Sequence, residues 1–227
     1  MPDDFAAIPA RVPLFPLPDS VLFPGQALPL HIFEARYRQM TADALAGDGY
    51  IAIALLKPGY EQSYFTHHAP IHTLVGLGKI IASHPLDGGK FNILLNGVTR
   101  FRVLGEFADK PYRVARGDVV LTRAPDFGPG GNGDADLEAT LRDELEKTIE
   151  PMLRGPCEPI REFFNGDFPL GRITDALAGG LQSPGPVRQM LLEELDDLER
   201  TRLLIEHLRT LTTMARRRCT QGSISLN

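Results

Sequence analysis

Residues 12–33, VPLFPLPDSVLFPGQALPLHIF, hold two short apolar runs on either side of a turn. The runs cover residues 12–17 and 27–33, and their lengths are typical of β-strands. Phe23–Pro24–Gly25 lies between them. Its proline presets φ and its glycine accepts a positive φ, as a type II turn requires. The sequence therefore predicts two strands at the start of the fold.

Further strands are predicted along the first half of the chain. Runs rich in β-branched and aliphatic residues cover 50–56, 71–82, 91–95, 98–104 and 112–121. Turn signals separate them at Asp87–Gly88–Gly89, Asn96–Gly97 and Lys110–Pro111. One early helix is predicted over 34–45, because Tyr37, Met40, Ala44 and Leu45 recur at helical spacing. Several strands with a single helix favour a closed or nearly closed β-barrel.

The sequence pattern of the second half of the chain predicts helices. Residues 125–135 are rich in glycine, proline and aspartate, which marks a linker. Helices are predicted over 137–149 and 172–178, and a long helix opens at Pro184–Gly185–Pro186 and runs toward Arg218. We therefore predict an α+β chain with a β-barrel subdomain at 1–124, a linker at 125–135 and a helical subdomain at 136–227 that ends in the long helix.

Composition narrows the class of protein. The chain has 227 residues, 43% of them hydrophobic, which is enough for a core and excludes a disordered tail protein. The net charge is −5, from 24 basic and 29 acidic side chains, so nonspecific nucleic-acid binding is disfavoured. The acidic N-terminus and the lack of an apolar stretch of about 20 residues predict a soluble, cytoplasmic protein without membrane contact.

No motif for catalysis or metal binding is found in the sequence. Gly78–Lys79 and Gly89–Lys90 are not followed by Ser or Thr, as a phosphate-binding loop requires, and no G-x-S-x-G elbow is present. We therefore predict no catalytic residue, no cofactor and no metal. Four histidines match no ligand spacing and are interpreted as polar loop residues rather than metal ligands; they are His67, His68, His72 and His84.

The remaining reactive and basic features have ordinary explanations. Cys157 and Cys219 lie far apart and form no C-x-x-C pair, so we expect both to be reduced. A hydrolase that uses Cys157 remains an alternative. The basic run Arg216–Arg217–Arg218 complements the negative end of the long helix, and the alternative is a nucleic-acid or partner patch.

Several ordered motifs resemble one known family. They are Val12–Pro13–Leu14–Phe15–Pro16–Leu17, Val21–Leu22–Phe23–Pro24–Gly25, the run LPLHIFEARYRQM at 28–40, Gly76–Leu77–Gly78–Lys79–Ile80, the run FNILLNGVTRFRV at 91–103, and Arg188–Gln189–Met190–Leu191–Leu192–Glu193. In this order they are similar to the N-terminal, substrate-binding domain of the ATP-dependent Lon proteases. The resemblance covers about 11–211.

The resemblance implies a PUA-like β-barrel followed by a small helical bundle. It also implies a standalone, noncatalytic version of the domain, because the sequence holds neither the ATPase nor the Ser-Lys peptidase module of the full-length proteases. The expected function is that of a polypeptide-binding or adaptor module for unfolded or exposed protein segments, with a separate protease as a further partner. The alternative is an RNA-binding PUA-like protein, which the acidic charge disfavours.

Two sets of residues are candidates for the binding surface. Tyr60, Tyr64 and Phe65 concentrate aromatic area in a polar connection, and the alternative is that their rings pack on the barrel. Five charged residues fall in the family motifs, namely Glu34, Arg36, Arg38, Arg100 and Arg102. We expect them to form a structural ion-pair network, with polypeptide contact as the alternative. The long C-terminal helix is a candidate for oligomerisation.

Overall fold

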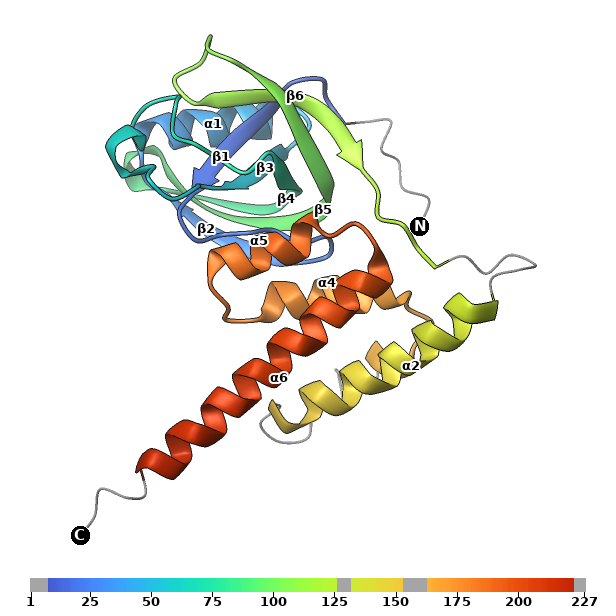
Figure 1. Cartoon of the computed structure of the whole chain (residues 1–227). Coiled ribbons are helices and arrows are strands. Elements are labelled where there is room, and N and C mark those ends of the chain that lie inside the picture. The colour runs from blue at the N-terminus through green and yellow to red at the C-terminus, as the bar shows by residue number, and fades with distance from the viewer. Residues whose placement is uncertain (1–7, 126–131, 153–162, 223–227) are drawn as a thin grey trace. The chain divides into compact units, whose positions relative to one another are not determined.

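The computed structural model describes residues 8–125, 132–152 and 163–222, with side chains from 134 in the second range and as far as 214 in the third. The chain divides into two compact units (Figure 1). The first, here the β unit, joins Met1–Leu121 to Asp175–Glu193, and the second, here the helical unit, joins Thr122–Thr174 to Glu194–Asn227. Among the described residues, no helix has the length and apolarity that a membrane crossing needs.

Six strands form the sheet of the β unit (Figure 1). They are β1 Val12–Leu17, β2 Ala27–Ile32, β3 Tyr50–Leu55, β4 Leu74–Leu86, β5 Lys90–Phe107 and β6 Arg113–Val120. The order is β2-β5-β4-β3-β1-β6, and β6 also pairs with β5, so five of the strands form a closed circuit and β2 is attached to it through β5. The β1–β3 pair is parallel and the other pairs are antiparallel. The predicted α+β class is confirmed.

Strand β5 corrects one sequence-based prediction. Asn96–Gly97 was expected to be a turn between two strands, but both residues lie inside the single 18-residue strand β5. The reason is a close approach of two backbones: a Cβ at position 97 would overlap the carbonyl oxygen of Phe23. Gly97 is therefore explained by packing against another segment rather than by chain reversal. The turn predicted at Phe23–Pro24–Gly25 is present, with Gly25 at φ 78°.

Helix α1, Ala35–Ala46, closes one side of the sheet and packs against β1, β2 and β5. Tyr37, Met40 and Ala44 are buried in one core cluster, as their helical spacing predicted, whereas Leu45 is exposed. This cluster includes Phe15 and the core-facing residues of β3 and β5. A second cluster lies around Leu14, Ala52 and Phe101, and on β1 and β3 its members alternate with those of the first cluster. The strands thus have apolar side chains on both faces.

The long helix predicted from Pro184 onward is two helices. α5 covers Gly185–Glu193 and α6 covers Asp197–Gly222, with three residues between them. The physical reason is a helix start signal inside the apolar stripe: Oδ1 of Asp196 accepts the backbone N–H groups of Leu198 and Glu199 at 2.9 and 3.1 Å. A side chain that caps free N–H groups begins a new helix at this point.

The helical unit contains α2, Asn132–Ile149, the single turn η4, Glu150–Met152, and α6 (Figure 1). α2 and α6 lie side by side and run in the same direction. Both helices carry buried leucines, Leu141 and Leu145 on α2 and Leu204 and Leu208 on α6, and Nη2 of Arg209 on α6 donates to Oε1 of Glu144 on α2 at 2.6 Å. The sequence spaces Leu137, Leu141, Leu145 and Ile149 four residues apart; the last three are buried and Leu137 is partly buried.

Helix α4, Leu170–Gly180, contains the boundary between the two units, which falls between Thr174 and Asp175. Contacts therefore group Asp175–Glu193 with the strands, whereas the sequence placed 136–227 in one helical subdomain. The limits 1–124 for the β-barrel subdomain, 125–135 for the linker and 136–227 for the helical subdomain stay a prediction. Part of the predicted linker, Cys157, and the side chains of Cys219 and of Arg216–Arg217–Arg218 lie outside the described residues.

Candidate functional site

The loop between β3 and β4 presents three aromatic rings. An isolated bridge between Leu56 and Ile71 closes the base of this loop, and the short helix η2, Glu61–Ser63, lies within it. Tyr60 precedes η2, and Tyr64 and Phe65 follow it. The ring centroids of Tyr60 and Tyr64 are 6.0 Å apart, and those of Tyr64 and Phe65 are 5.0 Å apart in an edge-on arrangement. Edge-on packing favours a defined orientation of both rings.

The three rings differ in exposure. Tyr60 and Tyr64 are partly buried, whereas Phe65 is 81% exposed. The sequence left open whether the rings bind a partner or pack on the sheet. The answer differs among the three residues. Tyr60 and Tyr64 are partly buried, and the ring of Phe65 is exposed to solvent.

Two of the charged motif residues support this loop from α1. Arg36 donates from Nε to Oε2 of Glu34 at 3.0 Å and from Nη1 to the backbone oxygen of Tyr64 at 3.2 Å. The Tyr64 hydroxyl donates to Oε1 of Glu34 at 3.4 Å. Glu34 therefore pairs across to the loop instead of capping α1, whose N-terminus has no side-chain cap. The ion pair joins Glu34 and Arg36 at the start of α1, and each of the two side chains also hydrogen-bonds to Tyr64 of the loop.

The guanidinium of Arg36 is also stacked on aromatic rings. Its central carbon lies 4.4 Å from the ring centroid of Tyr37, 5.3 Å from that of Tyr64 and 5.7 Å from that of Phe65. Such cation–π contacts favour a planar arginine over a lysine. Arg36 thus holds both the backbone and the rings of the loop against α1.

The local electrostatics keep the Tyr64 hydroxyl protonated. Burial raises the pKa of Tyr64, and the negative charge of Glu34 raises this pKa further. A protonated phenol can donate to the carboxylate of Glu34, so this polar contact persists across the neutral pH range. Nη2 of Arg36 is buried and has no hydrogen-bond partner in the described part of the chain.

Sequence reasoning missed Phe33. This residue follows β2 directly, is 60% exposed, and its ring stacks on that of His31 at a centroid distance of 6.0 Å. The signal was present in the alternation of β2, because Leu28, Leu30 and Ile32 point to the core and residues at odd positions therefore point away from it. Phe33 is the chain neighbour of Glu34, and Glu34 contacts both Arg36 and Tyr64. We call Phe33, Tyr60, Tyr64 and Phe65 the aromatic surface.

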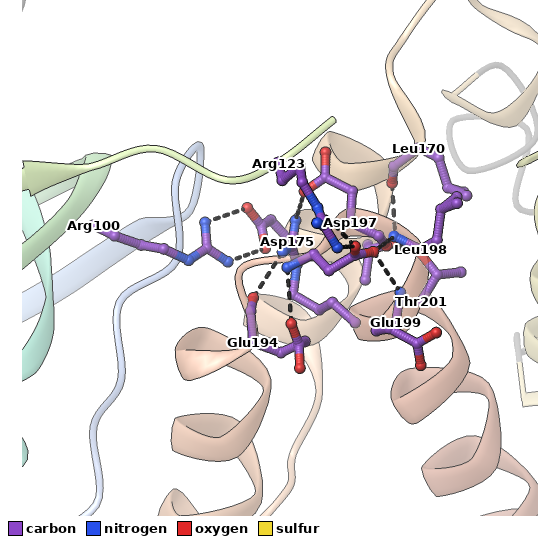
Figure 2. Close-up of polar contacts among 12 residues, drawn as sticks. Arg100, Arg123, Leu170, Asp175, Glu194, Asp197, Leu198, Glu199 and Thr201 are labelled. Carbon is purple, nitrogen blue, oxygen red and sulfur yellow. Dashed lines mark hydrogen bonds and ion pairs between the residues drawn. The ribbon is translucent and has the colours of Figure 1, made fainter. Parts of the chain in front are cut away.

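The other three arginines of the motifs lie elsewhere. Arg38 donates from Nη1 to the backbone oxygen of Gly88, at the tip of the β4–β5 hairpin. Arg100 is 2% exposed and bonded to Asp175 (Figure 2), and its Nε donates to the backbone oxygen of Leu192. Arg102 is exposed on β5. Glu34 and Arg36 therefore form one pair, and Arg38, Arg100 and Arg102 lie apart from it, so the five motif residues do not form one network.

The histidines are also dispersed. His72 contacts Oε1 of Glu193 through Nδ1 at 3.0 Å, and His84 is exposed on β4. In the ranges 8–125, 132–152 and 163–222, no group of three or more His, Cys, Asp or Glu side chains is placed to hold a metal ion.

The fold and this surface define an α+β domain whose sheet closes on β5 and which exposes aromatic rings beside α1. Two solved structures share the fold. The N-terminal domain of Mycobacterium avium complex Lon protease has a TM-score of 0.67 at 19% identity, over 88% of this chain and 98% of that one. The Lon N-terminal domain protein from Xanthomonas campestris has a TM-score of 0.59 at 21% identity, over 86% and 97%.

The model of the family "ATP-dependent protease La (LON) substrate-binding domain" matches residues 11–210, and the chain belongs to this family. Curated relatives include Lon protease 2 of Myxococcus xanthus, 26% identical over 204 residues, and Lon protease 2 of Sorangium cellulosum, 28% identical over 202 residues. These matches cover 88% and 86% of this chain and 24% of each relative. The chain thus spans about a quarter of the relatives' length, and the family resemblance predicted from the motifs is confirmed.

Proposed function

We propose that this chain is a noncatalytic module that recognises unfolded or exposed polypeptide segments through its aromatic surface. The observation that carries the proposal is the exposed ring of Phe65, 81% accessible, on a loop that Arg36 and Glu34 hold in place. The match to a substrate-binding domain supports recognition rather than chemistry.

The energetics of the aromatic surface favour protein ligands. Burying one phenylalanine side chain contributes about 1.5–3 kcal/mol, and rings that are already oriented lose little entropy on binding. Phe33 and Phe65 are both largely exposed, so both rings are available for apolar side chains of a ligand. Segments that expose apolar side chains, as unfolded proteins do, satisfy this chemistry.

The experiment measures binding of a permanently unfolded model protein, reduced and carboxymethylated α-lactalbumin, by fluorescence anisotropy. Phe65→Ser should weaken binding about tenfold, since one buried aromatic side chain contributes on the order of 1.4 kcal/mol or more. The melting temperature should stay unchanged, because the ring is exposed. Leu104→Ser is the matched control, since Leu104 is an exposed apolar residue on β5, 52% accessible.

Two results would contradict the proposal. One is an equal loss of binding in the Phe65 and Leu104 variants, which indicates nonspecific adhesion. The other is a shift of RNA mobility at physiological salt that Phe65→Ser abolishes, because aromatic rings beside an arginine also stack on bases.

Delivery of bound segments to a separate protease belongs to the same proposal, and pull-down with the native chain and the Phe65 variant tests it. Association through α6 is tested by sedimentation of the intact chain.

A further inference from the structure

Strand β2 is hydrogen-bonded on one side only. It pairs with β5 from Ala27↔Asn96 to Ile32↔Phe91, and no other described strand pairs with it. Its second edge is therefore open in the part of the chain that the structure describes. An open strand edge presents backbone N–H and C=O groups that can pair with another chain.

The register shows which backbone groups face outward. Gly97 donates its N–H to the carbonyl of Gln26 at 2.8 Å, so residue 26 faces β5. Backbone groups alternate along an antiparallel strand, and Leu28, Leu30 and Ile32 therefore also face β5. The N–H and C=O groups of Ala27 and His31, and the C=O group of Pro29, point away from β5. All three of these residues are exposed.

Pro29 makes this edge selective. Proline has no N–H, so the edge offers donors at Ala27 and His31 and acceptors at all three residues. A second copy of β2 is a poor occupant, because in the antiparallel register that pairs all three edge residues the two copies of Pro29 meet and neither donates. An ordinary peptide residue opposite Pro29 can still donate its own N–H to the Pro29 carbonyl.

The side chains around β2 indicate the chemistry of the occupant. Leu28 and Leu30 are only partly buried against the core cluster, and an added strand with apolar residues at alternate positions would cover them. The last pair of the register is Ile32↔Phe91, and the next residues outward on the two segments are Phe33 and exposed Lys90. Arg38 contacts the same hairpin. β2 itself has no acidic residue. These cations complement an acidic residue at that end of the occupant.

We propose that β2 is a strand-addition site for an extended polypeptide segment with alternating apolar residues and an acidic end. The inference rests on the proposed function and names the form in which the segment binds. Segments of this kind are core strands of other proteins, which become available only when those proteins unfold. Phe33 links the β2 edge to the aromatic surface, so the two sites can contact one ligand.

The test uses the full chain and a fluorescent peptide of about eight residues, the length of an ordinary strand, with alternating Val and Thr and a terminal Glu. Pro29→Ala adds an outward donor and should tighten binding about fivefold, the effect of one net hydrogen bond. His31→Pro removes a donor and should weaken binding by a similar factor. His31→Ala keeps the N–H and should bind like the native chain.

A second measurement uses two peptides N-methylated on alternate residues. Methylation of the face that meets β2 should abolish binding, and methylation of the other face should leave it unchanged. Equal binding by the native chain, Pro29→Ala and His31→Pro overturns the strand-addition proposal, as does an equal response to both methylated peptides. If Phe65→Ser still weakens binding of the unfolded protein in that case, the proposed function stands; if no polypeptide binds at all, both fall.

Self-pairing is distinguished by sedimentation. If Pro29→Ala promotes association of the chain without changing its affinity for the peptide, the edge is a site for a second copy and the proposal is overturned. If His31→Pro unfolds the chain, the peptide affinity of Pro29→Ala by itself tests the proposal, because that substitution removes no hydrogen bond of the fold.

Discussion

Arg100 and Asp175 form a bidentate ion pair within the β unit (Figure 2). Nη1 of Arg100 lies 2.9 Å from Oδ2 of Asp175, and Nη2 lies 2.7 Å from Oδ1, with the two side chains only 2% and 7% exposed. Nε of Arg100 donates to the backbone oxygen of Leu192 at 2.8 Å. One buried guanidinium thus holds β5, the second half of α4 and the end of α5 together.

Removing one partner of this pair should destabilise the β unit strongly. Arg100→Leu leaves the carboxylate of Asp175 buried, and we expect a loss of about 3–5 kcal/mol in the free energy of unfolding. Urea titration followed by circular dichroism measures it. Arg102→Leu is the control, because Arg102 is an exposed arginine on the same strand. Equal effects of the two substitutions would show that the buried pair carries no special stability.

Arg36 should determine the order of the aromatic loop. Arg36→Lys keeps the charge but lacks the planar guanidinium that bonds Glu34 through Nε and the Tyr64 backbone through Nη1 while it lies over the rings, so we expect a local cost of about 1 kcal/mol. Hydrogen exchange should accelerate at the amides of Ser63 and Thr66, whose N–H groups bond within the loop. Exchange in β3 should not change. Uniform acceleration across the β unit would contradict a local role for Arg36.

Gly97 should not tolerate a side chain. Alanine at this position would press its Cβ on the carbonyl of Phe23, and we expect Gly97→Ala to lower the free energy of unfolding by about 2 kcal/mol or more. Gly180→Ala is the matched control, because its Cβ would meet no atom within 4 Å. Thermal melts compare the two variants. A neutral Gly97→Ala would mean that the Phe23 segment moves away without cost.

Asp43 should make stability depend on pH in acid. Hydrogen bonds from the Tyr112 hydroxyl at 2.6 Å and from Lys110 at 3.0 Å lower the pKa of this carboxyl, the first being the larger cause. Because the folded pKa lies below the unfolded value of about 3.9, the contribution is complete above that value and is lost as the pH falls through the folded pKa. Asp43→Asn should therefore lose less stability than the native chain between about pH 5 and about pH 2. Parallel urea midpoints for the two proteins across this range would contradict the expectation.

The local pattern of the sequence predicted much of the fold. Short apolar runs at 12–17 and 27–33 became β1 and β2, and the spacing of Tyr37, Met40 and Ala44 placed α1 on the core. These features depend on periodicity and turn chemistry within a few residues, which a single sequence displays. The candidate site was predicted in part, since the loop aromatics and the charged motif residues were named without their mutual contact.

What the sequence determined by itself is therefore the α+β class, the family and the residues that carry its motifs. The tertiary structure alone decided that Gly97 lies inside a strand and that Asp175–Glu193 groups with the strands. It also decided that Glu34 and Arg36 hold Tyr64, and that β2 has an open edge. The physical reason is distance along the chain. Each of these contacts joins segments that are far apart in the sequence. Burial and the close approach of two backbones select which segments meet, and no local pattern contains that information.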